Sequence, residues 1–188
     1  MKRVFISIDV ENEKVIQNIK QVQKELLETG SSIKLVELFN LHLTLEFLGE
    51  INEKEVEYVM DIISSLSFAE FSLSFHCLVS LPNENYIRVI ATEVGGQVDI
   101  LKNLQSELRT KLKKGRFKVD KRAYTPHLTI ARVKSSKNKE KILKLLHSNK
   151  EKNFGTIKVD SINLKESILT PKGPKYITLF KKKVESNV

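Results

Sequence analysis

Apolar residues recur along this chain in two periods, one typical of helices and one typical of strands, and the two alternate. A spacing of three to four residues predicts helices over 11–29, 52–66, 98–114 and 138–148. Asn52 stands where the second helix needs an N-cap, and Gly30 follows the first helix as a C-terminal cap. We therefore expect four helices.

Alternation with a period of two predicts about nine strands between and after these helices. They are expected at 2–9, as a pair at 32–37 and 41–48, as a hairpin at 71–94, up to 133, and at 156–169 and 175–183. Tight connections without a steady βαβ alternation favour antiparallel sheets, so the expected fold class is α+β. Residues 1–188 are expected to form one domain, in which Gly95-Gly96 is either a crossing between two lobes or a turn.

The composition is typical of a compact globular protein with a basic surface. Apolar residues make up 40% and charged residues 29%, with 7 Gly and 4 Pro. The formal charge of +9 favours anionic partners, polynucleotide first among them, although lysine-rich helix faces are usually just solvated surface. The opening residues lack the features of a signal peptide, and no apolar run reaches the roughly 20 residues of a membrane span. We expect no membrane partner. The single cysteine, Cys77, suits a small buried hydrophobe in a reducing cytoplasm.

A short motif occurs twice, as LHLTL at 41–45 and as PHLTI at 126–130. Residues two apart on a strand point to the same face, so His42 and Thr44 share one surface, and His127 and Thr129 share another. In each pair the two positions lie roughly 6.6 Å apart, close enough to contact one small anion. With four histidines and nine threonines in the chain, two such pairs would arise by chance roughly one or two times in a hundred.

These residues resemble the 2H phosphoesterases, and within them the LigT-type RNA 2',3'-cyclic phosphodiesterases of the 2'-5' RNA ligase family. The resemblance runs the length of the chain and includes VFISID, NLHLTLEFLGEI, PHLTIARVK and LKESILTPKGPKYITL. It implies a two-lobed α+β fold with pseudo-twofold symmetry, in which each lobe is an antiparallel sheet flanked by helices. One motif from each lobe would face a central groove.

The resemblance also implies roles for five residues. His42 and His127 would be the catalytic pair, and Thr44, Thr129 and Arg132 would bind the phosphate. Simple strand geometry opposes the role of Arg132, because an offset of five from His127 places it on the opposite face. It reaches the groove only if a β-bulge or the end of the strand redirects it. The alternative is a structural ion pair.

Two histidines across a groove suit the opening of a 2',3'-cyclic phosphate. One neutral imidazole removes a proton from water, and a charged imidazolium protonates the departing ribose oxygen. The family resemblance implies that the 3' oxygen leaves and that a 2'-phosphate remains, with 2'-5' joining of RNA ends as a reverse activity. Which histidine is the acid stays open.

No metal and no cofactor are expected. Glu46 lies two residues beyond Thr44 and is expected on the His42 face, but four residues of strand separate it from His42 by about 13 Å. Shared coordination at about 2 Å is therefore difficult, and a surface ion pair is the expected role of Glu46. His76 and His147 lack the threonine partner, and Phe5 is expected to pack in the core rather than to stack a nucleobase.

The expected partner is RNA with 2',3'-cyclic phosphate ends, with tRNA fragments as one source. Two alternatives stay open. One is another 2H activity, on a 2'-5' linkage or a small cyclic nucleotide phosphate. The other is an RNA-binding module without turnover, in which the histidines only contact phosphate. A cytoplasmic monomer is expected, because one chain carries both an acid and a base.

Overall fold

The structure is a computed structural model that describes residues 1–171 and 173–184. Within these residues it contains four α-helices, which lie at α1 Glu13–Glu28, α2 Glu53–Ser64, α3 Val98–Lys114 and α4 Lys139–Ser148. A 3₁₀ helix, η1, covers Leu38–Asn40. All four predicted helices are confirmed.

Nine strands accompany the helices in the described part of the chain. They are β1 Lys2–Asp9, β2 Ile33–Leu35, β3 His42–Ile51, β4 Phe71–Pro82, β5 Ile87–Gly96, β6 His127–Val133, β7 Asn153–Val159, β8 Ser161–Thr170 and β9 Gly173–Lys183. They form two antiparallel sheets. The first, sheet A, has the order β3-β1-β8-β9, and the second, sheet B, has the order β2-β6-β5-β4-β7.

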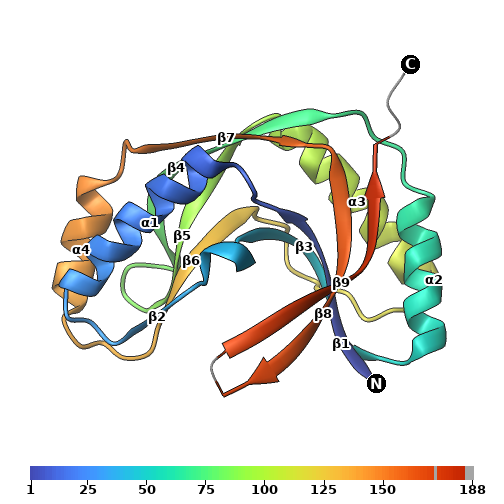
Figure 1. The fold of residues 1–188 in the computed structure, drawn as a ribbon, viewed down its shortest axis with the longest axis horizontal. Coiled ribbons are helices and arrows are strands. Elements are labelled where there is room, and N and C mark those ends of the chain that lie inside the picture. The colour runs from blue at the N-terminus through green and yellow to red at the C-terminus, as the bar shows by residue number, and fades with distance from the viewer. Residues whose placement is uncertain (172, 185–188) are drawn as a thin grey trace.

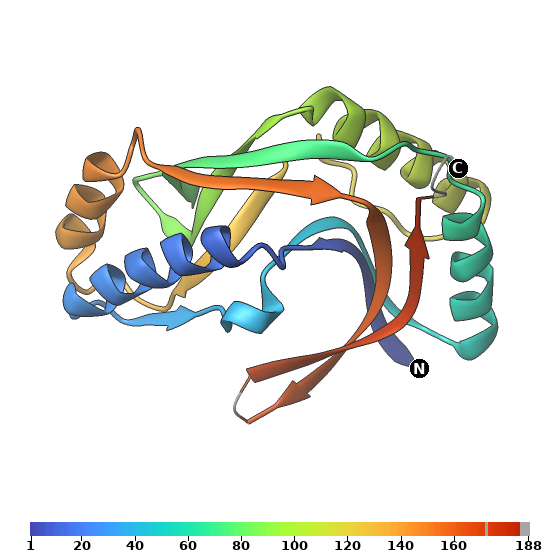
Figure 2. The same cartoon turned by 45° about the horizontal axis from the view of Figure 1, so that its top comes forward.

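Each sheet carries two helices on its outer side. Figures 1 and 2 show α1 and α4 against sheet B at one end of the molecule and α2 and α3 against sheet A at the other end. The apolar stripe of each helix packs onto its sheet, and the buried side chains join in one core that spans both lobes. The expected α+β fold of two antiparallel sheets flanked by helices is confirmed.

The start of α2 is fixed by a capping box. The side chain of Asn52 accepts a hydrogen bond from the backbone N–H of Glu55 at 3.0 Å, and the Glu55 carboxylate accepts one from the Asn52 N–H at 2.7 Å. Two backbone donors that a helix leaves unpaired are thereby satisfied. The helix therefore begins directly after β3, and it packs on the outer side of sheet A.

The predicted strand pair at 32–37 and 41–48 is wrong in its pairing. Both strands exist, but β2 pairs with β6 in sheet B, whereas β3 pairs with β1 in sheet A. Alternating apolar residues indicate a strand but do not show which strand it pairs with. The η1 turn lies between β2 and β3. The predicted hairpin at 71–94 is confirmed by the pairing of β4 with β5.

The chain passes between the two lobes several times. Gly95 and Gly96 end β5 in sheet B, and the next element, α3, packs against α2 and β3 of sheet A. Their use as a lobe crossing stays a prediction about domain organisation. None of the helices in residues 1–171 and 173–184 is both long and apolar enough to cross a membrane.

Candidate active site

A groove of about 650 Å³ lies where the two sheets meet. Its walls include His42 and Thr44 from β3 and Thr129 and Arg132 from β6, the two strands that carry the repeated motif. The β8–β9 hairpin adds Tyr176 and its neighbours to the wall. Figure 2 shows this hairpin extending beyond the rest of sheet A. Four of the five residues singled out by the sequence are therefore brought together.

His127 is the fifth predicted site residue, and it is not part of the groove wall. It is the first residue of β6, two positions before Thr129, and its side chain is half-buried. Because alternate residues share a face of a strand, its side chain lies on the same side of sheet B as that of Thr129. His127 therefore lies on the groove-facing side of sheet B but outside the groove wall itself.

Matching β-bulges shape the two motif strands. On β3, Ser7 of β1 pairs with Thr44 and Ile6 pairs with Glu46, so Leu45 is an extra residue. On β6, Ala91 of β5 pairs with Thr129 and Ile90 pairs with Ala131, so Ile130 is an extra residue. A bulge shifts the alternation of faces by one residue.

The bulge at Ile130 resolves the geometric objection to Arg132. The extra residue turns position 132 back to the face of Thr129, and Arg132 lines the groove together with Thr129. The equivalent bulge on β3 turns Phe47, which also lies five residues after its histidine, into the same groove. Its side chain is 63% exposed.

Both motif histidines are held by the same kind of hydrogen bond. Nδ1 of His42 lies 2.6 Å from the carbonyl oxygen of Asn40, and Nδ1 of His127 lies 2.9 Å from that of Thr125. A carbonyl oxygen only accepts, so Nδ1 carries the proton in each ring. In the neutral imidazole this leaves Nε2 with a free lone pair, and this is the nitrogen available for proton transfer.

Aromatic rings surround His42. Phe5 lies 5.0 Å from its ring centroid and Tyr176 lies 5.3 Å away, edge on. Burial lowers the pKa of His42 below 6.5, and the hydrogen bond to Asn40 opposes this shift only in part. His42 is therefore neutral at neutral pH. Phe5 is only 3% exposed, so it is buried as expected, but it also forms part of the groove wall beside His42.

A partly buried ion pair lies beside His42 on neighbouring strands. Asp9 of β1 is the cross-strand partner of His42, and its Oδ1 lies 2.6 Å from Nζ of Lys165 on β8. The Asp9 carboxylate raises the pKa of His42, whereas the Lys165 ammonium lowers it and has the larger effect of the two. The pair therefore adds to the effect of burial and favours the neutral imidazole.

The expected face and surface ion pair of Glu46 are wrong. The bulge turns Glu46 away from the groove, and it is only 3% exposed beneath α3. Its Oε2 accepts a hydrogen bond from Nε of Arg109 at 2.8 Å, and its Oε1 accepts one from the backbone N–H of Asp120 at 3.1 Å. Arg109 also donates to the carbonyl oxygen of Arg122 at 2.9 Å. A buried charge on the His42 strand therefore anchors the loop that leads to His127.

Several groove residues carried no sequence signal of their own. Phe39 and Phe47 are largely exposed aromatic side chains in the wall, and Tyr176 comes from a distant strand. The equal offset of Phe47 and Arg132 from their histidines is the one signal in the sequence that links two of these positions. Tyr124 packs against the core rather than lining the groove, and burial raises the pKa of its hydroxyl.

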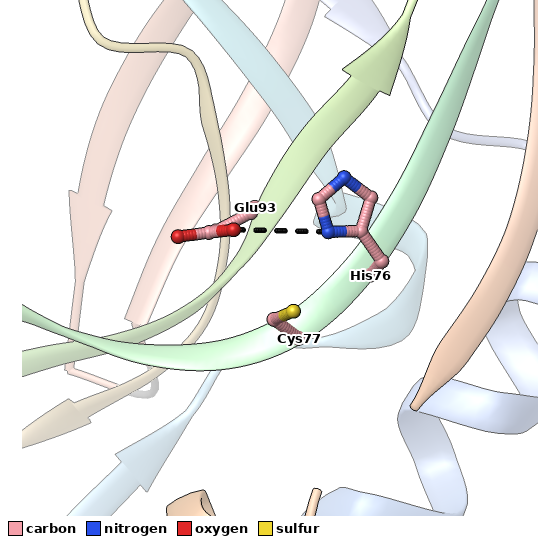
Figure 3. A group of neighbouring side chains, drawn as sticks. All are labelled: His76, Cys77 and Glu93. Atoms are coloured by element: carbon pink, nitrogen blue, oxygen red, sulfur yellow. Dashed lines mark ion pairs between the residues drawn. The ribbon is translucent and has the colours of Figure 1, made fainter. Parts of the chain in front are cut away.

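One group of metal-ligating side chains lies outside the groove, formed by His76 and Cys77 of β4 and Glu93 of β5. Figure 3 shows these three side chains close together, and their ligand atoms all lie within 4.8 Å of one another. Nδ1 of His76 is 3.7 Å from Oε2 of Glu93. The residue types suit Zn²⁺, but burial raises the pKa of the Cys77 thiol, which favours the protonated form over the thiolate that binds metal. Cys77 is half-buried, not the fully buried hydrophobe expected.

His147 and the two motif histidines stand apart from this group. His147 is exposed on α4 and lies 3.1 Å from Glu84. Within the described residues, neither His42 nor His127 belongs to a group of three or more ligand atoms close enough to share a metal ion.

A two-lobed α+β fold with one His-x-Thr strand in each lobe defines a 2H phosphoesterase. Residues 4–179 match the AKAP7 2'5' RNA ligase-like domain, and the chain belongs to that family.

The relatives and solved structures agree with this family. The chain is 37% identical to an RNA 2',3'-cyclic phosphodiesterase of Methanocaldococcus jannaschii, over 93% of this chain and 96% of that protein. It is 32% identical to one of Aeropyrum pernix, over 92% of this chain and 98% of that protein. The crystal structure of TT0787 of Thermus thermophilus superposes with a TM-score of 0.80 at 25% identity, over 99% of this chain and 100% of that one. E. coli LigT complexed with NADP+ shares the fold, with a TM-score of 0.74 at 19% identity over 97% of each chain.

Proposed function

We propose that this chain is an RNA 2',3'-cyclic phosphodiesterase that opens a terminal cyclic phosphate to a 2'-phosphate with two histidines. The relatives of similar length that carry this activity in their names support the substrate. The observation that carries the mechanism is the matched pair of motif strands, each of which holds a histidine by Nδ1 and leaves Nε2 available.

His42 is the general base in this mechanism. Its lowered pKa keeps Nε2 unprotonated at neutral pH, so it accepts a proton from water as the water oxygen attacks phosphorus. His127 is the general acid and protonates the 3' oxygen as its bond to phosphorus breaks. The product carries a 2'-phosphate and a 3'-hydroxyl, and the two imidazoles have exchanged protonation states. Proton exchange with solvent, which reaches the partly exposed His127, restores the starting state.

Thr44, Thr129 and Arg132 stabilise the negative charge that grows on the nonbridging oxygens. The two hydroxyls approach from opposite lobes, and the guanidinium supplies a permanent positive charge with a planar set of donors. Phe39 and Phe47 offer exposed ring faces to the base of the terminal nucleotide.

A 5'-hydroxyl in place of water would follow the same steps and yield a 2'-5' linkage. Joining of RNA ends therefore belongs to the proposal as a secondary activity. One chain supplies both the acid and the base, which supports a monomer. A tRNA fragment that ends in a 2',3'-cyclic phosphate carries the same reacting group, so the proposal includes it as a substrate.

The test is hydrolysis of an RNA with a 2',3'-cyclic phosphate end in the presence of EDTA, with identification of the product isomer. We expect the wild type to give a 2'-phosphate and both His42→Ala and His127→Ala to lose at least about 10² in kcat, because each removes one proton transfer. Gel filtration and circular dichroism of each variant check that the fold is intact.

Four outcomes would contradict all or part of the proposal. A 3'-phosphate product would reverse the leaving oxygen, and full activity of either variant would remove that histidine from the mechanism. If the wild type leaves this RNA unchanged, a 2'-5' linked dinucleotide and a small cyclic nucleotide phosphate become the substrates to test. Binding of all three without turnover would favour the RNA-binding module.

A further inference from the structure

A second cavity of about 500 Å³ opens beside the catalytic groove. It lies between the β4–β5 turn and the segment that links β6 to α4, two parts of the chain about fifty residues apart in sequence. Arg132 belongs to the walls of both cavities. An RNA strand that leaves the groove past Arg132 would therefore enter the second cavity directly.

The second cavity is lined by positive charge. Its wall holds Arg88, Arg132, Lys134 and Lys139, together with the hydroxyls of Ser135 and Ser136. Among the described residues, no Asp or Glu side chain is part of this wall. Four cations on one concave surface without a carboxylate attract a polyanion more strongly than the same charges on a mixed surface.

An aromatic ring stands at the edge of this cavity in a fixed orientation. Tyr86 is 57% exposed, and the guanidinium of Arg88 lies 4.8 Å from the centroid of its ring. Nη2 of Arg88 also donates a hydrogen bond to the Tyr86 hydroxyl at 2.8 Å. Lys139 anchors the same turn by donating from Nζ to the carbonyl oxygen of Asn85 at 2.8 Å. An exposed ring next to fixed cations suits one base and its phosphate.

We infer that the second cavity binds the nucleotide that precedes the cyclic phosphate end, so that the chain acts on oligomeric RNA in preference to a cyclic mononucleotide. This inference rests on the proposed function. A cyclic phosphate occupies the 3' end, so the rest of an RNA substrate extends only in the 5' direction. Arg88, Lys134 and Lys139 contact its phosphodiester groups, and Tyr86 stacks its base.

The experiment compares kcat/KM for a 2',3'-cyclic mononucleotide with kcat/KM for a single-stranded 10-nucleotide RNA ending in the same cyclic nucleotide. We expect the wild type to favour the longer substrate. Arg88→Ala and the double variant Lys134→Gln/Lys139→Gln should each lower kcat/KM for the RNA about 10-fold or more and leave the mononucleotide rate unchanged. Each lost phosphate contact should also reduce the slope of log KM against log salt by about 0.7.

Lys144→Gln is the matched control. It removes one positive charge from the same helix as Lys139, but Lys144 is exposed and lies outside the cavity wall. An equal loss in this variant would mean that net charge alone matters, and it would overturn the inference.

Further outcomes separate this inference from the proposed function. If the wild type hydrolyses both substrates equally well and the cavity variants change neither, the proposed function stands and the second site fails. Arg3 and Lys175 line the groove but not the second cavity. If Arg3→Gln or Lys175→Gln lowers kcat/KM for the RNA alone, and the cavity variants do not, the RNA strand leaves the groove past Arg3 and Lys175 and the inference is wrong. If neither substrate is hydrolysed by the wild type, the proposed function itself fails.

Discussion

The two motif strands have the same frame but differ at two consecutive positions. From the histidine to the bulged residue they match, with His42, Thr44 and Leu45 on β3 and His127, Thr129 and Ile130 on β6. The next residue is the buried charge Glu46 on β3, whereas β6 has the buried apolar residue Ala131. The bulge turns both of these residues away from the groove.

The residue after that faces the groove in both strands, and it is Phe47 on β3 and Arg132 on β6. The repeat thus sets the positions of the two histidines and the two hydroxyls, while the flanking residues give each half its own task. In the proposed mechanism the β6 half would contribute permanent positive charge for the phosphate through Arg132, and the β3 half would contribute an aromatic face through Phe47.

Among the substitutions that test this difference between the two strands, Arg132→Met should have the largest effect on activity. We expect kcat to fall by about 10² to 10³, because a fixed cation next to the developing oxyanion is lost. Arg132→Lys should recover part of this loss, since it keeps the charge but not the planar donors. Steady-state kinetics on the cyclic-phosphate RNA measures both variants. A loss of the same size from Phe47→Met would show that the two halves do not differ in this way.

The next largest effect is expected on stability, from substitution of the buried residue Glu46. Glu46→Gln leaves Arg109 without a counter-charge, so the free energy of unfolding should fall by about 3 kcal/mol. Urea denaturation measures this change, and Glu50→Gln, an exposed glutamate of the same strand, should change it by less than about 0.5 kcal/mol. The double variant Glu46→Gln/Arg109→Met should regain part of the lost stability. Equal losses in Glu46→Gln and Glu50→Gln would remove the special role of the buried pair.

A smaller effect is expected from Phe47→Ala. Loss of a stacking face should raise KM for the RNA about 5-fold with little change in kcat, because the ring contacts the base rather than the reacting atoms. Leu27→Ala, an exposed apolar residue on the outer helix α1, is the control for a lost surface side chain. A fall in kcat with unchanged KM would instead place Phe47 next to the chemistry.

The least effect is expected on the pH profile. As the proposed general base, His42 would be active when neutral. Burial lowers its pKa below 6.5, so activity should persist to a lower pH than for an exposed histidine. Tyr176→Ala exposes the ring and should move the acidic limb of kcat/KM upward, toward 6.5. Tyr176→Phe keeps the ring and should leave the limb in place. A downward shift in Tyr176→Ala would contradict the assignment of this limb to a buried base.

The helices and the motif pairs were predictable from the sequence, because each depends on spacing within one segment. The helix boundaries agree to within about two residues, and four of the five site residues line one groove. The partners of β2 and β3 could not be predicted, since alternation says nothing about which strand lies alongside.

The bulges explain the remaining differences at the site. An extra residue at Leu45 or Ile130 is recognisable only from the register with the neighbouring strand. Without it, strict alternation places Glu46 in the groove and Arg132 outside, which is the reverse of the structure. The burial of Glu46 therefore required knowledge of the pairing between β1 and β3.

The order of strands in sheet A determines when each strand can find its partner during synthesis. β1 lies between β3, which follows it within about 35 residues, and β8, which begins at Ser161. A nascent chain can pair β1 with β3 early, but the other edge of β1 stays open until the last strands emerge. The β8–β9 hairpin supplies the part of the groove wall that is synthesised last, so the groove is complete only after β9 has left the ribosome.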